Sequence, residues 1–294
     1  MIVVTTPTGD IGRQVVGHLL QQGEQVRVVV RDPDRLAPEV REHVEVIGGS
    51  HGDAGVVDRA FAGAEAVFWL VPPNPQAASV EAAYVDFSRP ASEALTRHGV
   101  RRVVGVTALG RGTPQAAHAG FVTGSLAMDE LMASSGVPYR ALAMPSFMDN
   151  LLRSVATIRD PGVFFSPISG DRKLPSCATR DIAAAAVRLL VDGGWTGFED
   201  SPVLGPEDLS FDDMAQIMTE VLGWPVQFQR ITPEALRERL TGFGMSDAMA
   251  AGMVDMAVAK DLGLDNAAPR TSESTTPTSF RQWCEDVLEP ALSD

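Results

Sequence analysis

A short segment rich in threonine and glycine, Thr6 to Gly12, follows an apolar run at residues 2–5 and precedes a stretch with helical spacing. Glycine at position 9 lets the backbone approach a bound group closely, and glycine at position 12 lets a helix pack tightly on the preceding strand. The first N–H groups of that helix have no partner within the helix and attract anions. The segment therefore predicts a turn that holds the pyrophosphate of a dinucleotide, with a plain strand-to-helix connection as the alternative. The predicted cofactor-binding residues of the turn are Thr6, Thr8, Gly9, Asp10, Ile11 and Gly12.

The residues after the second apolar run indicate which dinucleotide is bound. Sites for NAD(H) usually place an acidic residue at the end of this strand, where it holds the ribose hydroxyls. Here the run ends in Val30-Arg31-Asp32, and the guanidinium of Arg31 can bind a 2′-phosphate through two hydrogen bonds. The order of residues favours NADP(H) over NAD(H), while Asp32 remains available to the ribose. The alternative is that Arg31 is only a solvated surface residue.

The elements that must position this turn follow from the hydrophobic pattern of the first half of the chain. Apolar, β-branched runs predict buried strands at 2–5, 25–30, 44–47, 66–71, 102–107 and 139–143. Amphipathic stretches predict helices between them at 10–22, 56–61, 85–98 and 126–134. Strands that alternate with helices predict an α/β fold, a doubly wound parallel Rossmann sheet.

The pattern changes near residue 145. Residues 146–175 are rich in Gly, Pro and Ser, which predicts loops with short strands. Further helices are predicted at 180–191, 211–222, 233–240, 246–261 and 279–288. We therefore expect an NAD(P)-binding Rossmann domain at 1–145 and a smaller, mainly helical C-terminal substrate lobe at 146–294. We also expect the chain to cross back to the sheet between about 175 and 205.

Composition excludes several other classes of protein. The formal net charge of −14 argues against nucleic-acid partners and against docking on anionic membranes. The two cysteines, Cys177 and Cys284, lack metal-site spacing and are expected to be small buried residues. No Gly-x-Ser-x-Gly, Walker or His-Glu-x-x-His motif occurs, so no metal site is predicted. No signal peptide or membrane-spanning run is apparent, which favours a cytoplasmic protein.

Taken together, the motifs of the chain resemble those of the NmrA-like group of atypical short-chain dehydrogenases/reductases, which includes quinone oxidoreductase-like and NADPH-sensor proteins. The matching segments are Thr8-Gly9-Asp10-Ile11-Gly12, Val29-Val30-Arg31-Asp32-Pro33 and Ser135-Gly136-Val137-Pro138-Tyr139, with others at 63–68, 99–104, 145–150 and 180–183. The resemblance implies that Val71, Pro72 and Pro73 line the adenosine or nicotinamide-ribose side of the cofactor. It also implies that Thr107 and Ala108 lie beside the nicotinamide, and that a loop at 145–150, through Pro145 and Phe147, closes over it.

The chain departs from the family pattern at two places. The glycine that usually opens the turn is replaced by Thr6, followed by Pro7, and a β-branched residue is stiffer there. The Tyr-x-x-x-Lys pair of short-chain reductases is also missing, because its places are held by Phe121 and Ser125. Neither side chain can act as the general acid of that pair.

The remaining candidates for chemistry are therefore Thr107, His118 and Asn150. Thr107 could hydrogen-bond a substrate carbonyl, His118 could donate a proton, and Asn150 could orient a carbonyl or carboxamide. For His118 the alternative is a surface loop histidine, and for Asn150 a loop or helix-capping residue. Four methionines at helical spacing form either core or the wall of a flexible apolar cleft that would suit an aromatic ligand; they are Met245, Met249, Met253 and Met256.

These observations favour an NADP(H)-dependent oxidoreductase that reduces a quinone or other carbonyl-type small molecule without a Tyr-x-x-x-Lys pair. A quinone needs little acid catalysis, because the reduced oxygen can take its proton from water. Two alternatives stay open: an NADP(H)-sensing regulatory binding protein, and a pathway enzyme that uses the fold for nonredox chemistry. The expected partner is an aromatic or quinone-like small molecule, not a nucleic acid or a membrane, and a homodimer is possible.

Overall fold

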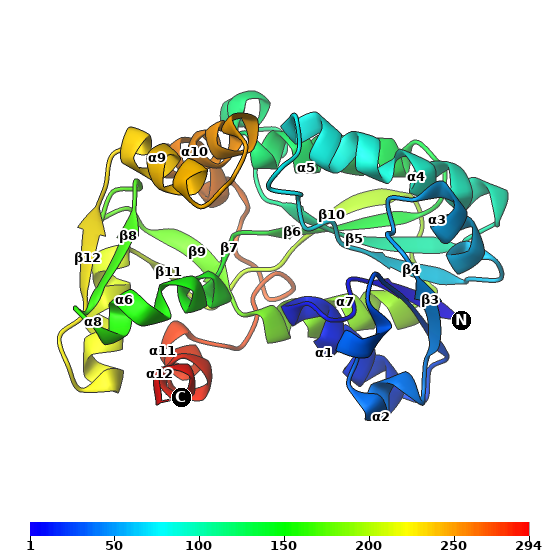
Figure 1. The fold of residues 1–294 in the computed structure, drawn as a ribbon, viewed down its shortest axis with the longest axis horizontal. Helices are drawn as coiled ribbons and strands as arrows, with labels where there is room; N and C mark the ends of the chain where they lie inside the picture. Colours follow the sequence, from blue (N-terminus) through cyan, green and yellow to red (C-terminus); the bar gives the residue numbers. More distant parts are fainter. Residues whose placement is uncertain (294) are drawn as a thin grey trace.

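A seven-stranded parallel sheet forms the centre of the structure, a computed structural model that describes residues 1–293 (Figure 1). The strands lie in the order β10-β6-β5-β4-β1-β2-β3, and every neighbouring pair is parallel. They are β1 (Ile2–Thr5), β2 (Val26–Val30), β3 (Glu45–Gly48), β4 (Ala66–Trp69), β5 (Arg102–Ala108), β6 (Tyr139–Met144) and β10 (Phe198–Pro202). Because β1 pairs with β2 on one side and with β4 on the other, the strand order reverses at β1. Doubly wound sheets bind their ligands at the carboxyl ends of the strands at such a point.

Helices cover both faces of the sheet, as Figure 1 shows. One face carries α1 (Asp10–Gln21) and α7 (Thr179–Val191), with the short α2 (Pro38–Arg41) nearby. The other face carries α3 (Ala54–Phe61), α4 (Phe87–Arg97) and α5 (Phe121–Ala133). The inner strands are largely apolar because both of their faces are covered, and every residue of β1 and β4 is buried.

The remainder of the chain builds a second, mainly helical part beside the sheet. Its helices are α6 (Val155–Arg159), α8 (Phe211–Leu222), α9 (Pro233–Gly242), α10 (Asp247–Asp261), α11 (Phe280–Trp283) and α12 (Glu289–Ser293). Two small sheets, β11-β9-β7 and β12-β8, join them. Their strands are β7 (Ser146–Phe147), β8 (Val163–Ser166), β9 (Leu174–Cys177), β11 (Asp208–Leu209) and β12 (Gln227–Arg230). The chain enters this part after β6, returns to the sheet for α7 and β10, and then leaves it again.

The predicted α/β fold and its doubly wound parallel sheet are confirmed. The predicted strands are all present, but the seventh strand, β10, was not expected. Its residues are mostly polar and partly exposed because it forms the edge of the sheet, so it lacks the apolar pattern of the inner strands. Helix α5 begins at Phe121 rather than at residue 126, directly after Gly120, which has a positive φ of 51°.

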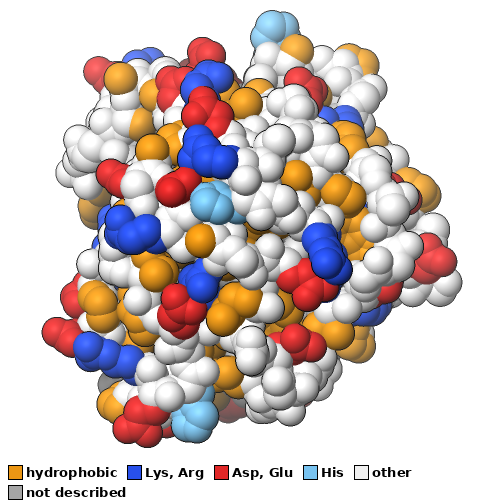
Figure 2. Space-filling model, turned by 90° about the vertical axis from the view of Figure 1, so that its right-hand side faces the viewer, with side chains coloured by type: hydrophobic (Ala, Val, Ile, Leu, Met, Phe, Trp, Pro, Cys, Tyr) orange, Lys and Arg blue, Asp and Glu red, His pale blue; other side chains and the backbone are white. Residues whose placement is uncertain are grey.

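The surface mixes side chains of different kinds. On the face that carries β3 and α3, acidic, basic and apolar side chains alternate without a large patch of one sign (Figure 2). Both cysteines are buried, as predicted. Among residues 1–293, no helix combines the length and the apolar character needed to cross a bilayer.

Candidate functional site

The turn between β1 and α1 has an unusual backbone at its first residue. Thr6 has φ of +52° and is the only non-glycine residue among residues 1–293 with a positive φ. This conformation is strained for a β-branched side chain. It explains why a glycine is usual at this position of the turn. The carbonyl oxygen of Thr6 accepts a hydrogen bond of 3.1 Å from the Gly9 N–H, which closes the turn.

The two remaining glycines of the turn have different roles. A Cβ atom on Gly12 would overlap the carbonyl group of Thr6, whereas a Cβ atom on Gly9 would lie 3.5 Å from the same oxygen, an ordinary contact. Gly12 is therefore required for the helix to pack on the turn. Gly9 is exposed and has φ of −85°, so the fold itself does not require a glycine there.

The amino end of α1 is suited to an anion. Gly9 is the N-cap residue and has no side chain to satisfy the first N–H groups of the helix. The hydroxyl oxygen Oγ1 of Thr6 is buried and has no hydrogen-bond partner among residues 1–293. A buried, unpaired hydroxyl beside an uncapped helix end fits a phosphate, which supplies the missing acceptor. The residues present therefore fit the pyrophosphate of a dinucleotide.

Arg31 lies exposed directly after β2, next to the turn. Asp32 is used locally, because its carboxylate accepts a hydrogen bond of 3.1 Å from the Asp34 N–H and caps the short 3-10 helix η1 (Pro33–Arg35). The Arg31 guanidinium is therefore the charged group at this strand end that can reach toward a ligand.

Sequence reasoning missed a buried histidine close to Arg31. His51 follows β3, packs edge-on against Trp69 and Phe87, and has its Nε2 atom 3.1 Å from the Leu70 carbonyl oxygen. Burial lowers its pKa from 6.5 to about 4, and the positive charge of Arg31 adds to the effect. The ring is therefore neutral at pH 7, and its Nε2–H donates to the carbonyl. The glycine-rich segment around it, at 48–52, was the available signal.

Beyond the end of β4, the chain runs along the switch point. The Thr5 hydroxyl donates to the Phe68 carbonyl oxygen at 3.0 Å and accepts from the Leu70 N–H at 3.0 Å. These bonds hold the ends of β1 and β4 together after the regular pairing stops. Of the residues predicted to line the cofactor here, Val71 is buried, Pro73 is half-buried and Pro72 is exposed.

At the end of β5, Thr107 lies under α5 rather than open to solvent. Its hydroxyl is 2.8 Å from the hydroxyl of Ser125, the residue at the place of the missing lysine. One helical turn later, Asp129 is fully buried and accepts hydrogen bonds from Tyr139 at 2.7 Å and from Arg111 at 2.8 Å. The place of the missing lysine thus belongs to a set of buried polar contacts that was not predicted, although Ser125 and Asp129 have the spacing of one helix face.

Burial is the main cause of an unusual acidity in this network. It raises the pKa of Asp129 from 3.8 to about 7, although hydrogen bonds from Thr107 and Tyr139 and the charge of Arg111 favour the carboxylate. Arg111 also binds Asp200 of β10 at 2.9 Å. The guanidinium therefore ties the segment after β5 to α5 and to the edge strand, which fixes the backbone that follows Thr107 and Ala108.

The loop after β6 contains two predicted cofactor-binding residues in protected positions. Pro145 is buried, and Phe147 is half-buried in β7, where it pairs with Cys177 of β9. Asn150 is exposed in the 3-10 helix η4 (Met148–Ser154). Its neighbour Asp149 instead makes the local contact, accepting from the Thr179 N–H at 3.0 Å and from its hydroxyl at 2.8 Å.

The predicted site residues therefore fall into two groups. The turn at 6–12, Val71, Thr107 with Ala108, and Pro145 lie at or just beyond the carboxyl ends of β1, β4, β5 and β6, along one edge of the sheet. His118 is exposed at the end of the 3-10 helix η3 (Pro114–His118), and Asn150 is exposed in η4. Neither of these two is buried among the residues at the strand ends.

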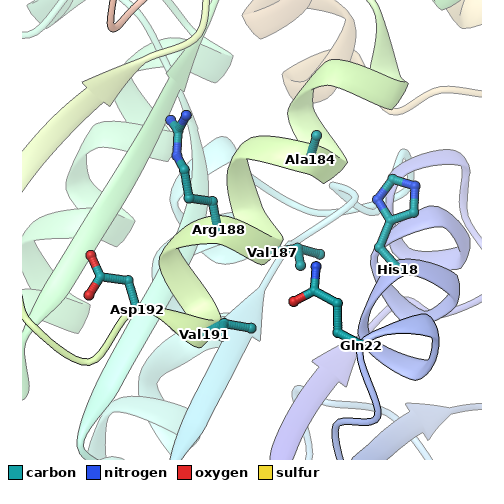
Figure 3. Close-up of a pocket in the computed structure, with 7 residues that line it drawn as sticks. All are labelled: His18, Gln22, Ala184, Val187, Arg188, Val191 and Asp192. Atoms are coloured by element: carbon teal, nitrogen blue, oxygen red, sulfur yellow. The ribbon is translucent and has the colours of Figure 1, made fainter.

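A separate groove of about 450 Å³ lies between α1 and α7 (Figure 3). Figure 3 shows His18 and Gln22 on one side of it, with Arg188 and Asp192 on the other. These residues belong to the carboxyl ends of the two helices or follow them. In a parallel α/β unit, the carboxyl end of a helix lies at the opposite edge of the sheet from the ligand site. The groove is therefore not part of the candidate site.

Comparison with known proteins agrees with this geometry. The model of the NAD(P)H-binding family matches residues 7–192. A (4-alkanoyl-5-oxo-2,5-dihydrofuran-3-yl)methyl phosphate reductase of Streptomyces griseus is 34% identical over 82% of this chain and 80% of its own length. An NAD(P)H azoreductase of Xenophilus azovorans is 28% identical over 87% of this chain and 86% of its own length.

A solved structure shares the fold over almost the whole chain. It is an NADPH-dependent quinone oxidoreductase of Escherichia coli in complex with NADPH. Its TM-score is 0.79 at 22% identity, and the match covers 96% of this chain and 98% of that one. The likeness therefore extends through both the sheet and the mainly helical part.

Proposed function

This chain belongs to the NAD(P)H-binding family, among the NmrA-like reductases of the atypical short-chain type, and on that premise we propose that it is an NADP(H)-dependent reductase of conjugated small molecules such as quinones. The observation that carries the proposal is the turn at the switch point, where the uncapped start of α1 and the unpaired Thr6 hydroxyl follow β1, and Arg31 follows the neighbouring parallel strand β2. An anionic dinucleotide with a 2′-phosphate satisfies all three groups.

The family relationship and the site together point to a substrate class. The relatives are named for acting on an oxo-dihydrofuran, an azo compound and a quinone. All three are electron-poor conjugated systems, which accept hydride without strong activation of a single carbonyl group. This chemistry suits a chain that holds Phe121 and Ser125 at the places of the tyrosine and lysine.

In this proposal the chain's own residues bind and orient the reactants. The turn at 6–12 holds the pyrophosphate, Arg31 selects the 2′-phosphate, and Val71 with Pro72 and Pro73 lines the adenosine or ribose side. Ala108, Pro145 and Phe147 form the apolar surroundings of the nicotinamide, and Thr107 keeps the end of β5 in place through Ser125. The cofactor supplies the hydride. The protein contributes orientation and the exclusion of water.

The direct test is oxidation of NADPH and NADH by the purified full-length chain. The acceptors are 2,3,5,6-tetramethyl-1,4-benzoquinone, a naphthoquinone and an azo dye, and calorimetry gives the affinity for each nucleotide. We expect turnover with at least one acceptor and tighter binding of NADPH than of NADH. Tight NADPH binding without turnover of any acceptor would overturn the proposal and favour an NADP(H)-sensing protein. Weak binding of both nucleotides would instead favour nonredox chemistry.

A further inference from the structure

A buried lysine occupies a position that the family motifs do not explain. The chain has 24 cationic Lys and Arg residues, and only Lys173 and Lys260 are lysines. Lys173 is exposed, but Lys260 is 5% exposed and forms an ion pair with Asp265, which is 1% exposed. A chain that uses arginine almost everywhere thus places an amine in one buried site. Unlike a guanidinium, an amine can give up its proton.

Lys260 lies at the end of the methionine face of α10. Met249, Met253, Met256 and Lys260 are spaced by four, three and four residues, so they share one side of the helix. The three methionines pack against the core beneath α4 and α5. A Cβ atom on Gly120 would overlap the Gly252 carbonyl, so α10 crosses the start of α5 at close range. The methionine face, with Lys260 at its end, therefore lies over the start of α5.

The segment after α10 brings Lys260 and Asp265 to the end of β5. The 3-10 helix η5 (Leu264–Ala267) contains Asp265, and its Leu264 is packed so close to Gly110 that a side chain there would overlap it. Leu264 belongs to an apolar cluster with Val122, against which Ala108 packs. Ala108 is the residue expected beside the nicotinamide.

The opposite side of the pair faces the loop after β6. The 3-10 helix η5, which contains Asp265, contacts β9, and β9 ends at Cys177. Cys177 is paired with Phe147, another residue expected at the nicotinamide. The segment that carries Asp265 therefore contacts both the turn after β5 and the strand that pairs with β7 after β6.

The hydrogen bonds of the pair are incompletely satisfied. Oδ1 of Asp265 is buried and has no hydrogen-bond partner in the part of the chain that the structure describes. Within the same residues, the ammonium of Lys260 donates one hydrogen bond, to Oδ2 of Asp265, although it carries three N–H donors. A buried polar group without a partner costs about 1–3 kcal/mol, so such an arrangement is typical of a site that is completed by another molecule.

We propose that Lys260 is the proton donor of the reductase reaction, a role that rests on the proposed function. As the substrate accepts a hydride from the reduced nicotinamide, negative charge develops on its oxygen or nitrogen. The Lys260 ammonium transfers one proton to that atom, so an N–H bond breaks and an O–H or N–H bond forms on the product. The neutral amine then regains a proton from water. Asp265 positions the ammonium through their ion pair.

Conservative substitution separates this role from a purely structural one. Lys260→Arg keeps the charge and the pairing with Asp265, but a guanidinium does not release its proton. We expect kcat for the azo dye to fall by about 10²- to 10⁴-fold, and kcat for the benzoquinone to fall less, because the reduced quinone oxygen can also take its proton from water. The NADPH dissociation constant and the melting temperature should stay unchanged. Lys173→Arg is the matched control and should behave as the wild type. A Lys260→Arg variant with wild-type kcat would overturn the inference while leaving the proposed function intact.

Chemical labelling of the wild-type protein gives a second readout that does not depend on turnover. The two lysines and the amino terminus are acetylated with an N-hydroxysuccinimide ester and quantified by mass spectrometry. We expect NADP⁺ together with 2,3,5,6-tetramethyl-1,4-benzoquinone to slow labelling of Lys260 and to leave Lys173 unaffected. This quinone has no free ring position that could react with an amine. Equal labelling with and without the ligands, or no labelling of Lys260 in the free protein, would overturn the inference. Failure of the wild-type protein to oxidise NADPH with any acceptor would contradict the proposed function, and this outcome is distinct from the labelling result for Lys260.

Discussion

The carbonyl group of Thr6 occupies the space that a side chain on Gly12 would need. The two residues therefore fix each other, since the left-handed Thr6 presents its carbonyl inward and only a glycine can pass it at the start of α1. The packing of the first helix on the sheet depends on this contact.

Substitution of the two glycines should separate packing from cofactor binding. Gly12→Ala forces a shift of the backbone, and we expect the free energy of unfolding to fall by about 1–3 kcal/mol. Gly9→Ala makes only an ordinary contact of 3.5 Å with Thr6, so stability should change by less than about 0.5 kcal/mol. Its added methyl group should nevertheless weaken NADPH binding. Urea denaturation and calorimetry measure the two effects, and a large loss of stability in Gly9→Ala would contradict this assignment.

Restoring the glycine at position 6 should stabilise the protein. A left-handed conformation costs an L-residue about 1–2 kcal/mol, and glycine avoids this cost. The greater conformational entropy of glycine in the unfolded chain offsets about 0.5–1 kcal/mol of the resulting stabilisation. We therefore expect Thr6→Gly to raise the free energy of unfolding by about 1 kcal/mol. Thr8→Gly is the control, because Thr8 is not among the residues with positive φ, and it should lower stability. Denaturation curves in which both variants shift in the same direction would count against strain at Thr6.

Arg31 should discriminate between the two nicotinamide dinucleotides. Arg31→Ala removes the guanidinium that we assign to the 2′-phosphate, so the dissociation constant for NADPH should rise by about 10- to 100-fold, the loss of a hydrogen bond to a charged group. Binding of NADH should not change. Arg35→Ala, which removes another exposed arginine four residues later, serves as the control in calorimetry. An equal loss of affinity for both nucleotides would show that Arg31 does not read the 2′-phosphate.

His51 should make the free energy of unfolding decrease as the pH becomes acidic. Its pKa is about 4 in the folded protein and 6.5 as the ordinary value, so the unfolded chain binds the proton more readily. The stability linked to neutral His51 is therefore present above about pH 6.5 and is lost as the pH falls toward 4, by up to about 3 kcal/mol.

The comparison with His51→Gln isolates this effect, because glutamine can keep a donor to the Leu70 carbonyl but does not titrate. The difference in unfolding free energy between wild type and His51→Gln should shift in favour of the variant between pH 7 and pH 4.5. His43→Gln, at an exposed histidine, is the control and should show a smaller shift. A difference that is constant over this range would rule out the buried, neutral ring.

The sequence predicted strands and turns well at positions where a residue type has a single physical role. Runs such as Val3-Val4 predict strands buried on both faces, and the turn before α1 could be located because glycines, strand and helix occur together. β10 escaped prediction because the segment Phe198–Pro202 is polar and lies at the sheet edge, where burial does not impose an apolar pattern.

The parts of the site that were missed depend on contacts between distant segments. Thr107 meets Ser125, and Asp129 meets Tyr139, only after α5 has packed on β5 and β6. Leu264, next to Asp265, packs on Gly110 after β5, and α10 crosses the start of α5 at Gly120 and Gly252. No local sequence pattern predicts contacts between residues so far apart in the chain. From the sequence alone, Ser125 was therefore interpreted only as the replacement of the family's lysine.

The path of the chain between its two parts also bears on how a ligand enters. Three connections, after β6, after β9 and after β10, join the sheet to the mainly helical part. A single linker would act as a hinge, but three separate tethers resist a swing of one part as a rigid body. We therefore expect access to the site to open through local displacement of α10 and η5. For the same reason, a fragment truncated at residue 145 would lose α7 and β10 and leave the α1 face of the sheet uncovered.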